Sequence, residues 1–290
     1  MKSDGGVMLN SSVRRKAIEA LKKTVAEHEA VREKTTHASE RLFEQRRRAA
    51  REVIERVETY VNLLANSPKE FDKTVADYRI AAGRFDRHVK RLEIEAAQAT
   101  KVGSATGTAG AMAGVGVAAL GPSAAMAVAT TFGAASTGTA ISALSGAAAA
   151  NAALAWLGGG ALATGGGGMA AGGALLALAG PVGWGVAGTA VLGSALFLRS
   201  RNRRYAEEAT ESRVEVQGEI RSLAAAMREI EGLRQQIGEH ADGCLADLQW
   251  LNKFAPTDYR EFQNDQKERL AALINHIRSL GKLLSAQVDL

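Results

Sequence analysis

A stretch of 97 consecutive residues, from Val102 to Leu198, contains no Asp, Glu, Lys, Arg or His. A water-soluble domain covers the outer face of its helices and strands with polar side chains, many of them charged. An apolar run of about 18 residues already indicates a membrane span, and this stretch is several times longer. The sequence therefore predicts that residues 102–198, which we call the charge-free segment, enter a lipid bilayer in at least one state of the protein.

All 36 Lys and Arg residues and all 31 Asp and Glu residues lie in the two flanks. We expect three parts: a soluble N-terminal helical hairpin at 1–101, the membrane-inserting segment at 102–198, and a soluble C-terminal helical hairpin at 199–290. The net charge of +5 favours an anionic bilayer as the partner, and no nucleic acid is expected. The first ten residues lack the apolar core of a Sec signal peptide, so we expect a membrane-associated protein that starts from a soluble cytoplasmic form.

The flanks have the apolar periodicity of long amphipathic helices. One helix is expected over about 10–66, with a break near Thr35 and Thr36, and a second begins at Ser67 and runs into the charge-free segment. A third carries a 3–4 apolar repeat with the spacing of a coiled coil. A fourth follows Pro256, capped by Thr257. The seam of the third helix, through which copies of the chain or a protein partner would pack, is predicted at Ile220, Leu223, Met227, Ile230, Ile237, Leu248 and Leu251.

The charge-free segment is rich in small residues, with 23 glycines among its 97 residues. Small residues four apart let helices approach closely in lipid, which predicts packing at Gly103, Gly107, Gly110, Gly114, Gly168, Gly172, Gly185 and Gly193. The apolar side chains expected to enter the bilayer are Val102, Val115, Leu120, Leu154, Trp156, Leu157, Met169, Leu175, Leu176, Trp184, Leu192, Leu196, Phe197 and Leu198. Two or four bilayer crossings fit the length equally, and a core permanently wrapped by the flanks is the alternative.

A basic cluster stands directly at the end of the charge-free segment. Arg199, Arg201, Arg203 and Arg204 are predicted to contact lipid headgroups, each contributing about 1 kcal/mol near an anionic surface. A second run, Arg46 to Arg48 with Arg51, is interspersed with glutamates. We interpret it as a solvated helix face, with phosphate binding as the alternative.

No arrangement of residues indicates catalysis, a cofactor or a metal site, and we do not expect an enzyme. The five histidines lie far apart in the sequence without a partner at ligand spacing, which is typical of surface or seam polar residues. The one cysteine, Cys244, excludes an intramolecular disulfide. Function is therefore expected from helix packing and lipid contact rather than from a reactive group.

These observations predict an all-α fold, with long amphipathic helices forming a coiled-coil or four-helix bundle around or next to a Gly/Ala-rich, membrane-inserting helical hairpin. The layout resembles the α-helical pore-forming toxins of the cytolysin A type and the apolipoprotein L-like membrane-active proteins. That resemblance implies a bacterial toxin or defence effector that oligomerises in a bilayer through transmembrane helices with glycine-zipper packing and permeabilises it. The alternative is a constitutive inner-membrane scaffold whose cytoplasmic helices recruit a protein partner.

Overall fold

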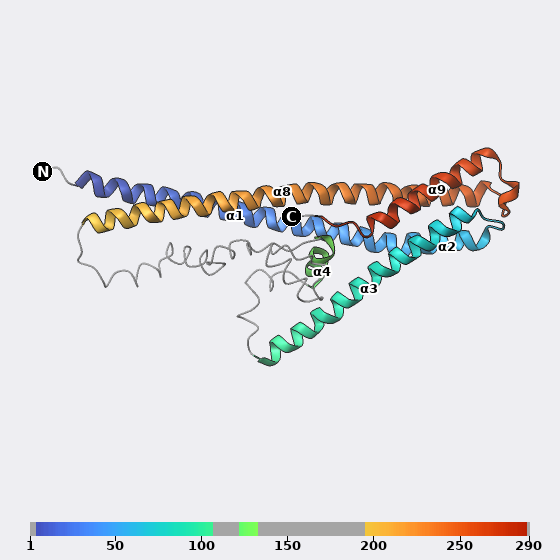
Figure 1. The fold of residues 1–290 in the computed structure, drawn as a ribbon, viewed down its shortest axis with the longest axis horizontal. Helices are drawn as coiled ribbons and strands as arrows, with labels where there is room; N and C mark the ends of the chain where they lie inside the picture. The colour runs from blue at the N-terminus through green and yellow to red at the C-terminus, as the bar shows by residue number, and fades with distance from the viewer. Residues whose placement is uncertain (1–3, 107–121, 133–194, 289–290) are drawn as a thin grey trace. The chain divides into compact units, whose positions relative to one another are not determined.

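A computed structural model describes residues 4–106, 122–132 and 195–288, and these ranges are almost entirely helical (Figure 1). This confirms the predicted all-α class. Of the charge-free segment, the structure describes α4, the end of α3 and the start of α8. The elements in chain order are α1 (Asp4–Arg48), the π-helical turn η1 (Ala49–Val53), α2 (Ile54–Leu63), α3 (Lys69–Thr106), α4 (Pro122–Thr131), α8 (Ala195–Phe254), the 3₁₀ turn η4 (Tyr259–Glu261) and α9 (Asn264–Leu283).

Contacts between residues divide the chain into two units. Unit 1 comprises Met1–Thr35 with Ala155–Ala225, and unit 2 comprises Thr36–Leu154 with Ala226–Leu290. The helices α1 and α8 contribute residues to both units. Each unit is described by itself.

In unit 1, α1 and α8 pack against each other and run in the same direction. Val13 lines a groove with Ala206 and Thr210. About four turns further along, His28 Nε2 lies 3.2 Å from the Glu219 carboxylate. Small and apolar side chains between these points are buried, which gives the helix pair a narrow core. The buried apolar residues are Leu21, Ala206, Ala209, Val216 and Leu223.

In unit 2, the first long helix contains a π-helical turn rather than the predicted break at Thr35 and Thr36. Both threonines are buried inside α1, and the Thr35 hydroxyl donates to the Val31 carbonyl, 2.9 Å away. A π-turn releases a backbone carbonyl from the regular hydrogen-bond ladder. Here the Tyr78 hydroxyl of α3 donates to the Ala49 carbonyl at 2.7 Å, which fixes α3 against η1.

The chain reverses direction twice in unit 2, and the two turns are joined by their backbones. The Ala65 N–H donates to the Thr257 carbonyl at 2.7 Å, and the Tyr259 N–H donates to the Ala65 carbonyl at 3.0 Å. Asn66 has a left-handed backbone with φ of 55°, and its amide donates to Asp258 Oδ2 at 3.0 Å. This pairing holds the α2–α3 turn beside the α8–α9 turn.

The fourth helix begins at Asn264, later than the predicted start after Thr257. Gln263 and Gln266 form a reciprocal capping box there, which supplies the donors and acceptors that the first turn lacks. The intervening residues instead form η4, capped by the Asp258 side chain.

The core of unit 2 lies between α3, α9 and the parts of α1, α2 and α8 that belong to this unit. Rings from α3 pack on the first helices: the Phe43 and Phe85 centroids lie 6.0 Å apart, and those of Tyr60 and Phe71 lie 6.2 Å apart. Burial raises the pKa of Tyr60 to about 12. The apolar side chains that α9 buries here are Leu270, Leu273, Ile274, Ile277, Leu280 and Leu283.

The prediction of transmembrane helices is wrong for the part of the chain that the structure describes, where no helix is long and apolar enough to span a bilayer. The reason is physical. The long helices carry charges along most of their length, and α4, which is apolar, has only 10 residues. A helix needs about 20 residues to cross the hydrocarbon core. The pore-forming assignment that depended on such helices is withdrawn with them.

The paired turns generate a stability prediction. Replacing Asn66 by Ala should lower the free energy of unfolding by about 1–2 kcal/mol, because alanine disfavours the left-handed backbone and cannot donate to Asp258. Asn66→Gly should cost less, since glycine adopts that backbone freely. Urea unfolding followed by circular dichroism measures both. Asn252→Ala, on the exposed surface of α8, is the control; equal effects of Asn66→Ala and Asn66→Gly would contradict the argument.

Candidate functional site

The helix α4 brings part of the charge-free segment into contact with the charged flanks. It packs against α3, and six consecutive residues at its end, 127–132, are buried. Four of these residues are fully buried: Ala127, Val128, Thr131 and Phe132. The charge-free segment is therefore shielded from water here by helices that carry the charges.

Two threonine hydroxyls near the end of α4 are satisfied inside the helix. The Thr130 hydroxyl donates to the Met126 carbonyl at 2.9 Å, and the Thr131 hydroxyl donates to the Ala127 carbonyl at 2.6 Å. Such back-bonding to the preceding turn lets a threonine occupy an apolar environment without an unpaired hydroxyl. Carbonyls at the C-terminal end of α4, those of Thr130 and Thr131, accept hydrogen bonds from other elements.

Arg46 of α1 supplies donors to that end. Its side chain is 1% exposed, and its guanidinium donates to the Thr130 carbonyl at 3.1 Å and to the Ala286 carbonyl at 2.5 Å. A helix C-terminus carries a partial negative charge, which favours a cation at this position. The arginine therefore links α1, α4 and the segment that follows α9.

The buried guanidinium has no carboxylate partner among the hydrogen bonds and ion pairs of the described residues. Burial lowers the pKa of Arg46 to about 10, which still leaves it charged at neutral pH. Its Nε has no hydrogen-bond partner in the described residues. A buried charge is costly unless it is paired or hydrogen-bonded, so the stability of this arrangement depends on the carbonyls that face it.

The segment after α9 closes the site from the other side. The Val288 N–H donates to the Thr131 carbonyl at 2.9 Å, and Phe132 and Val288 form an isolated β-bridge. Both Phe132 and Val288 are fully buried. We call the combination of Arg46, the facing surface of α3 and residues 284–288 the α4 cradle.

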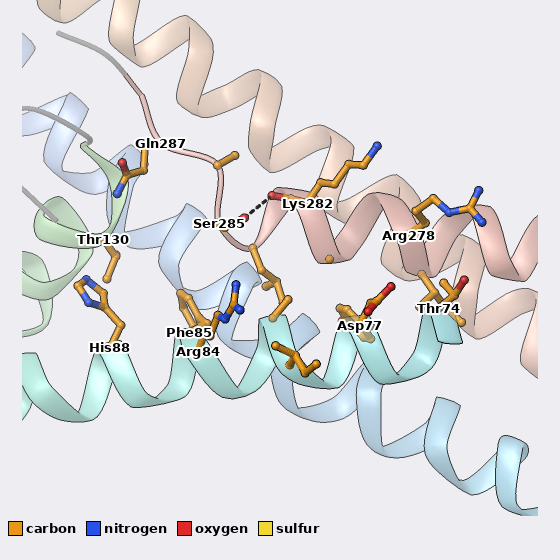
Figure 2. Close-up of a pocket in the computed structure, with 17 residues that line it drawn as sticks. Thr74, Asp77, Arg84, Phe85, His88, Thr130, Arg278, Lys282, Ser285 and Gln287 are labelled. Atoms are coloured by element: carbon orange, nitrogen blue, oxygen red, sulfur yellow. Dashed lines mark hydrogen bonds between the residues drawn. The ribbon is translucent and has the colours of Figure 1, made fainter. Parts of the chain in front are cut away.

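A groove of about 600 Å³ borders the cradle between α3, α9 and the segment after α9 (Figure 2). Tyr78, Phe85 and Ile277 give it apolar walls, while Arg84 and Lys282 lie among its polar lining. In Figure 2, His88 of α3 points toward Thr130 of α4. The groove and the cradle share walls, since Thr130 and Ala286 line the groove and also accept the hydrogen bonds of Arg46.

The prediction of a solvated face at the arginine run is wrong for Arg46 and correct for its neighbours. Arg48 and Arg51 are exposed and pair with Glu52 and Asp86 at 3.0 and 3.3 Å. Helix geometry separates them, because successive residues lie about 100° apart around the axis. The apolar residues Leu42, Phe43, Ala49 and Ala50 mark the buried face, and a closer reading of that stripe would have placed Arg46 on it.

The histidines are also less isolated than the sequence indicated. His28 lies beside Glu219, and the imidazoles of His240 and His276 are in contact, with 3.0 Å between their Nδ1 atoms. Sequence spacing could not show this pair, because 36 residues and a chain reversal separate its members. No group of three or more His, Cys, Asp or Glu in the described ranges is arranged to hold a metal ion.

The predicted seam residues lie on one long helix, α8. Leu223, Ile230, Ile237, Leu248 and Leu251 are buried within the single chain, and Ile220 and Met227 are half-buried. Their part in joining copies or partners stays a prediction. The predicted headgroup-binding residues Arg203 and Arg204 are exposed near the start of α8, and each pairs with a glutamate one turn later, Glu207 at 2.8 Å and Glu208 at 3.2 Å.

Most of the residues predicted to insert into lipid lie outside the described ranges. Val102 and Gly103 belong to α3, and Leu196, Phe197 and Leu198 to α8, together with Arg199 and Arg201. Those outside the described residues are Val115, Leu120, Leu154, Trp156, Leu157, Met169, Leu175, Leu176, Trp184 and Leu192, and the glycines Gly107, Gly110, Gly114, Gly168, Gly172, Gly185 and Gly193.

Comparison of the chain with protein-family models, with curated proteins and with solved structures finds no match. The α4 cradle and the charge distribution of the sequence are therefore the features that bear on function.

The cradle generates a prediction about Arg46. Replacing Arg46 by Met keeps an unbranched apolar stem but removes the guanidinium, which leaves the Thr130 and Ala286 carbonyls without its donors. We expect a loss of about 2 kcal/mol in the local stability of α4, the range of one or two charge-assisted hydrogen bonds. Hydrogen exchange read by mass spectrometry on peptides covering 122–132 measures this loss.

Arg47→Met is the matched control, because Arg47 is the next residue and its side chain is 44% exposed. It should change exchange of α4 by less than about 0.5 kcal/mol. Equal exchange in the two variants would show that Arg46 does not hold α4.

Proposed function

We propose that this protein binds lipid bilayers through its charge-free segment, and that the α4 cradle holds part of this segment away from water in the unbound form. The observation that carries the proposal is the burial of residues 127–132 of a 97-residue uncharged segment against charged helices. Apolar surface that the protein buries in one state can contact lipid in another state, once it is released.

The chemistry of α4 supports transfer between the two environments. Its Thr130 and Thr131 hydroxyls keep their hydrogen bonds inside the helix. Transfer of α4 into lipid therefore leaves neither hydroxyl without a hydrogen-bond partner. Leaving the cradle removes the donors of Arg46 and Val288 from its C-terminal carbonyls, which makes release unfavourable without a compensating partner. A bilayer compensates by taking up apolar surface at about 25 cal/mol per Å².

We also propose that the helices of unit 2 form a four-helix bundle beside which the charge-free segment docks. The support is the pair of chain reversals, in which α3 returns along α1 and α2 while α9 returns along α8. Arg79 of α3 pairs with Glu58 of α2, and Arg269 of α9 donates to Asp247 of α8 at 3.0 Å. Homo-oligomer formation on the membrane, through the small-residue spacing of the charge-free segment, is part of the proposal.

The alternative of a scaffold that recruits a partner through α8 gains less support. In the described conformation the residues that such a partner would use, among them Ile230, Ile237 and Leu251, are buried within the chain itself. A partner would have to displace α8 from its own core.

Co-flotation with liposomes tests the proposal. Wild-type protein should float with vesicles containing anionic phospholipid, and Leu192→Asp should float about tenfold less or worse, because an aspartate near the bilayer centre costs about 2.5–3.5 kcal/mol. Asn252→Asp adds the same charge on the exposed surface of α8 and is the control, expected to float like wild type. Wild-type protein that stays at the bottom of the gradient would overturn the proposal.

A further inference from the structure

The geometry of the contact between His240 of α8 and His276 of α9 limits how many protons the two imidazoles can carry. The two Nδ1 atoms lie 3.0 Å apart, and the ring centroids lie 5.2 Å apart. At this distance one Nδ1 must carry a hydrogen and the other a lone pair. The hydrogen bond between the rings therefore holds a single hydrogen, shared between the two Nδ1 atoms.

Asp247 sets the hydrogen positions on His276. This aspartate is 3% exposed; its Oδ1 accepts from Arg269 at 3.0 Å, while its Oδ2 is buried without a partner among the described residues. His276 Nε2 lies 3.9 Å from that oxygen. A hydrogen on Nε2 directed at the carboxylate is favoured, which leaves His276 Nδ1 as the acceptor for a hydrogen of His240.

One added proton fits this arrangement and a second does not. A positive charge on His276 lies beside Asp247, and its Nδ1–H can donate to a neutral His240. With both rings charged, two N–H groups face each other across 3.0 Å, which is repulsive. Burial and the neighbouring His276 both lower the pKa of His240, in agreement with this limit.

The other groups around the pair do not remove the repulsion. On α8, Glu239 precedes His240 and acts to raise its pKa, yet burial and His276 outweigh it. On α9, Arg269 is already engaged with Asp247, and Arg278 pairs with Glu70. Cys244 of α8 and Tyr78 of α3 face this region with their pKa values raised by burial, so neither is ionised near neutral pH. From α1, uncharged Gln45 lies against Gly238.

The His276 ring has little room to move by local adjustment, whereas His240 is half-buried. A Cβ atom placed on Gly243 would lie 2.5 Å from His276 Cε1, so the imidazole is pressed against the backbone of α8. Repulsion between two charged rings therefore opposes the packing of α9 against α8. The segment that directly follows α9 contacts the α4 site at two points. The Ala286 carbonyl accepts from Arg46, and the Val288 N–H donates to the Thr131 carbonyl of α4.

We propose that the His240–His276 pair is an acid-sensitive contact that keeps α9 against α8 at neutral pH and, when both rings are protonated, loosens the α4 cradle. Acid is thereby a trigger for release of the charge-free segment. The identity of what is released rests on the proposed function, whereas the acid response of the cradle does not.

Hydrogen exchange at pH 7.5 and pH 5.5, without lipid and corrected for the intrinsic pH dependence of exchange, tests the proposal. Peptides covering 122–132 and 284–288 should exchange several-fold faster at the lower pH, because the opened state takes up protons that the closed pair excludes. The sign follows from the lowered pKa of His240: the unfolded or opened state binds more protons below about pH 6.5, so stability falls as pH falls.

His240→Gln is the deciding variant, because glutamine can still donate to His276 Nδ1 and cannot become charged. It should abolish most of the acid response while leaving exchange at pH 7.5 close to wild type. His37→Gln, an exposed histidine of α1 beside Glu40, should keep the full response. If His240→Gln is poorly folded, NMR titration of the wild-type imidazoles replaces it, and two well-separated steps are expected from the pair.

An acid response that is equal in wild type and His240→Gln, or two independent imidazole titrations of ordinary pKa, would overturn the proposal. Acid-accelerated exchange of α4 in a protein that never floats with vesicles would instead retain the acid-sensitive contact and overturn only the membrane function.

Discussion

A buried arginine without a carboxylate partner is the interaction on which the described site depends. The Arg46 guanidinium is surrounded by protein and is neutralised in part by the Thr130 and Ala286 carbonyls. An arginine in such a place stabilises the fold only while those acceptors stay in position, and it disfavours any state in which one of them leaves without replacement. It thereby makes the position of α4 depend on the segment after α9, and the reverse.

This dependence shows how the chain covers the part of its uncharged segment that the structure describes at α4, residues 127–132. At α4 the charged helices cover the segment and also satisfy its end carbonyls. In the proposed function, α4 stays shielded as long as the cradle binds it more favourably than a bilayer does. The balance can shift either because the bilayer becomes more attractive or because the cradle weakens, and a ligand or proton acts only through its difference between the two states.

The all-α class was predictable from sequence because helix periodicity and the scarcity of proline in the flanks act locally. The buried stripes at Val53 and Val57 and at Leu270 and Ile277 follow from the same local pattern. The π-turn at 49–53 was not predictable in this way, since it depends on the Tyr78 hydroxyl that takes up the released carbonyl of Ala49. The role of Arg46 and the His240–His276 contact likewise depend on residues more than 35 positions away, which periodicity does not report.

The most direct test of the account is a distance measurement between α4 and α3 in solution and on vesicles. Spin labels at Met126→Cys of α4 and Lys90→Cys on the exposed face of α3 give this distance by pulsed EPR, and the buried Cys244 stays unlabelled. The account predicts one short, narrow distribution in solution at neutral pH and a longer, broader one on anionic vesicles. An unchanged short distance in vesicle-bound protein would show that α4 stays in its cradle on the membrane and would contradict the central claim.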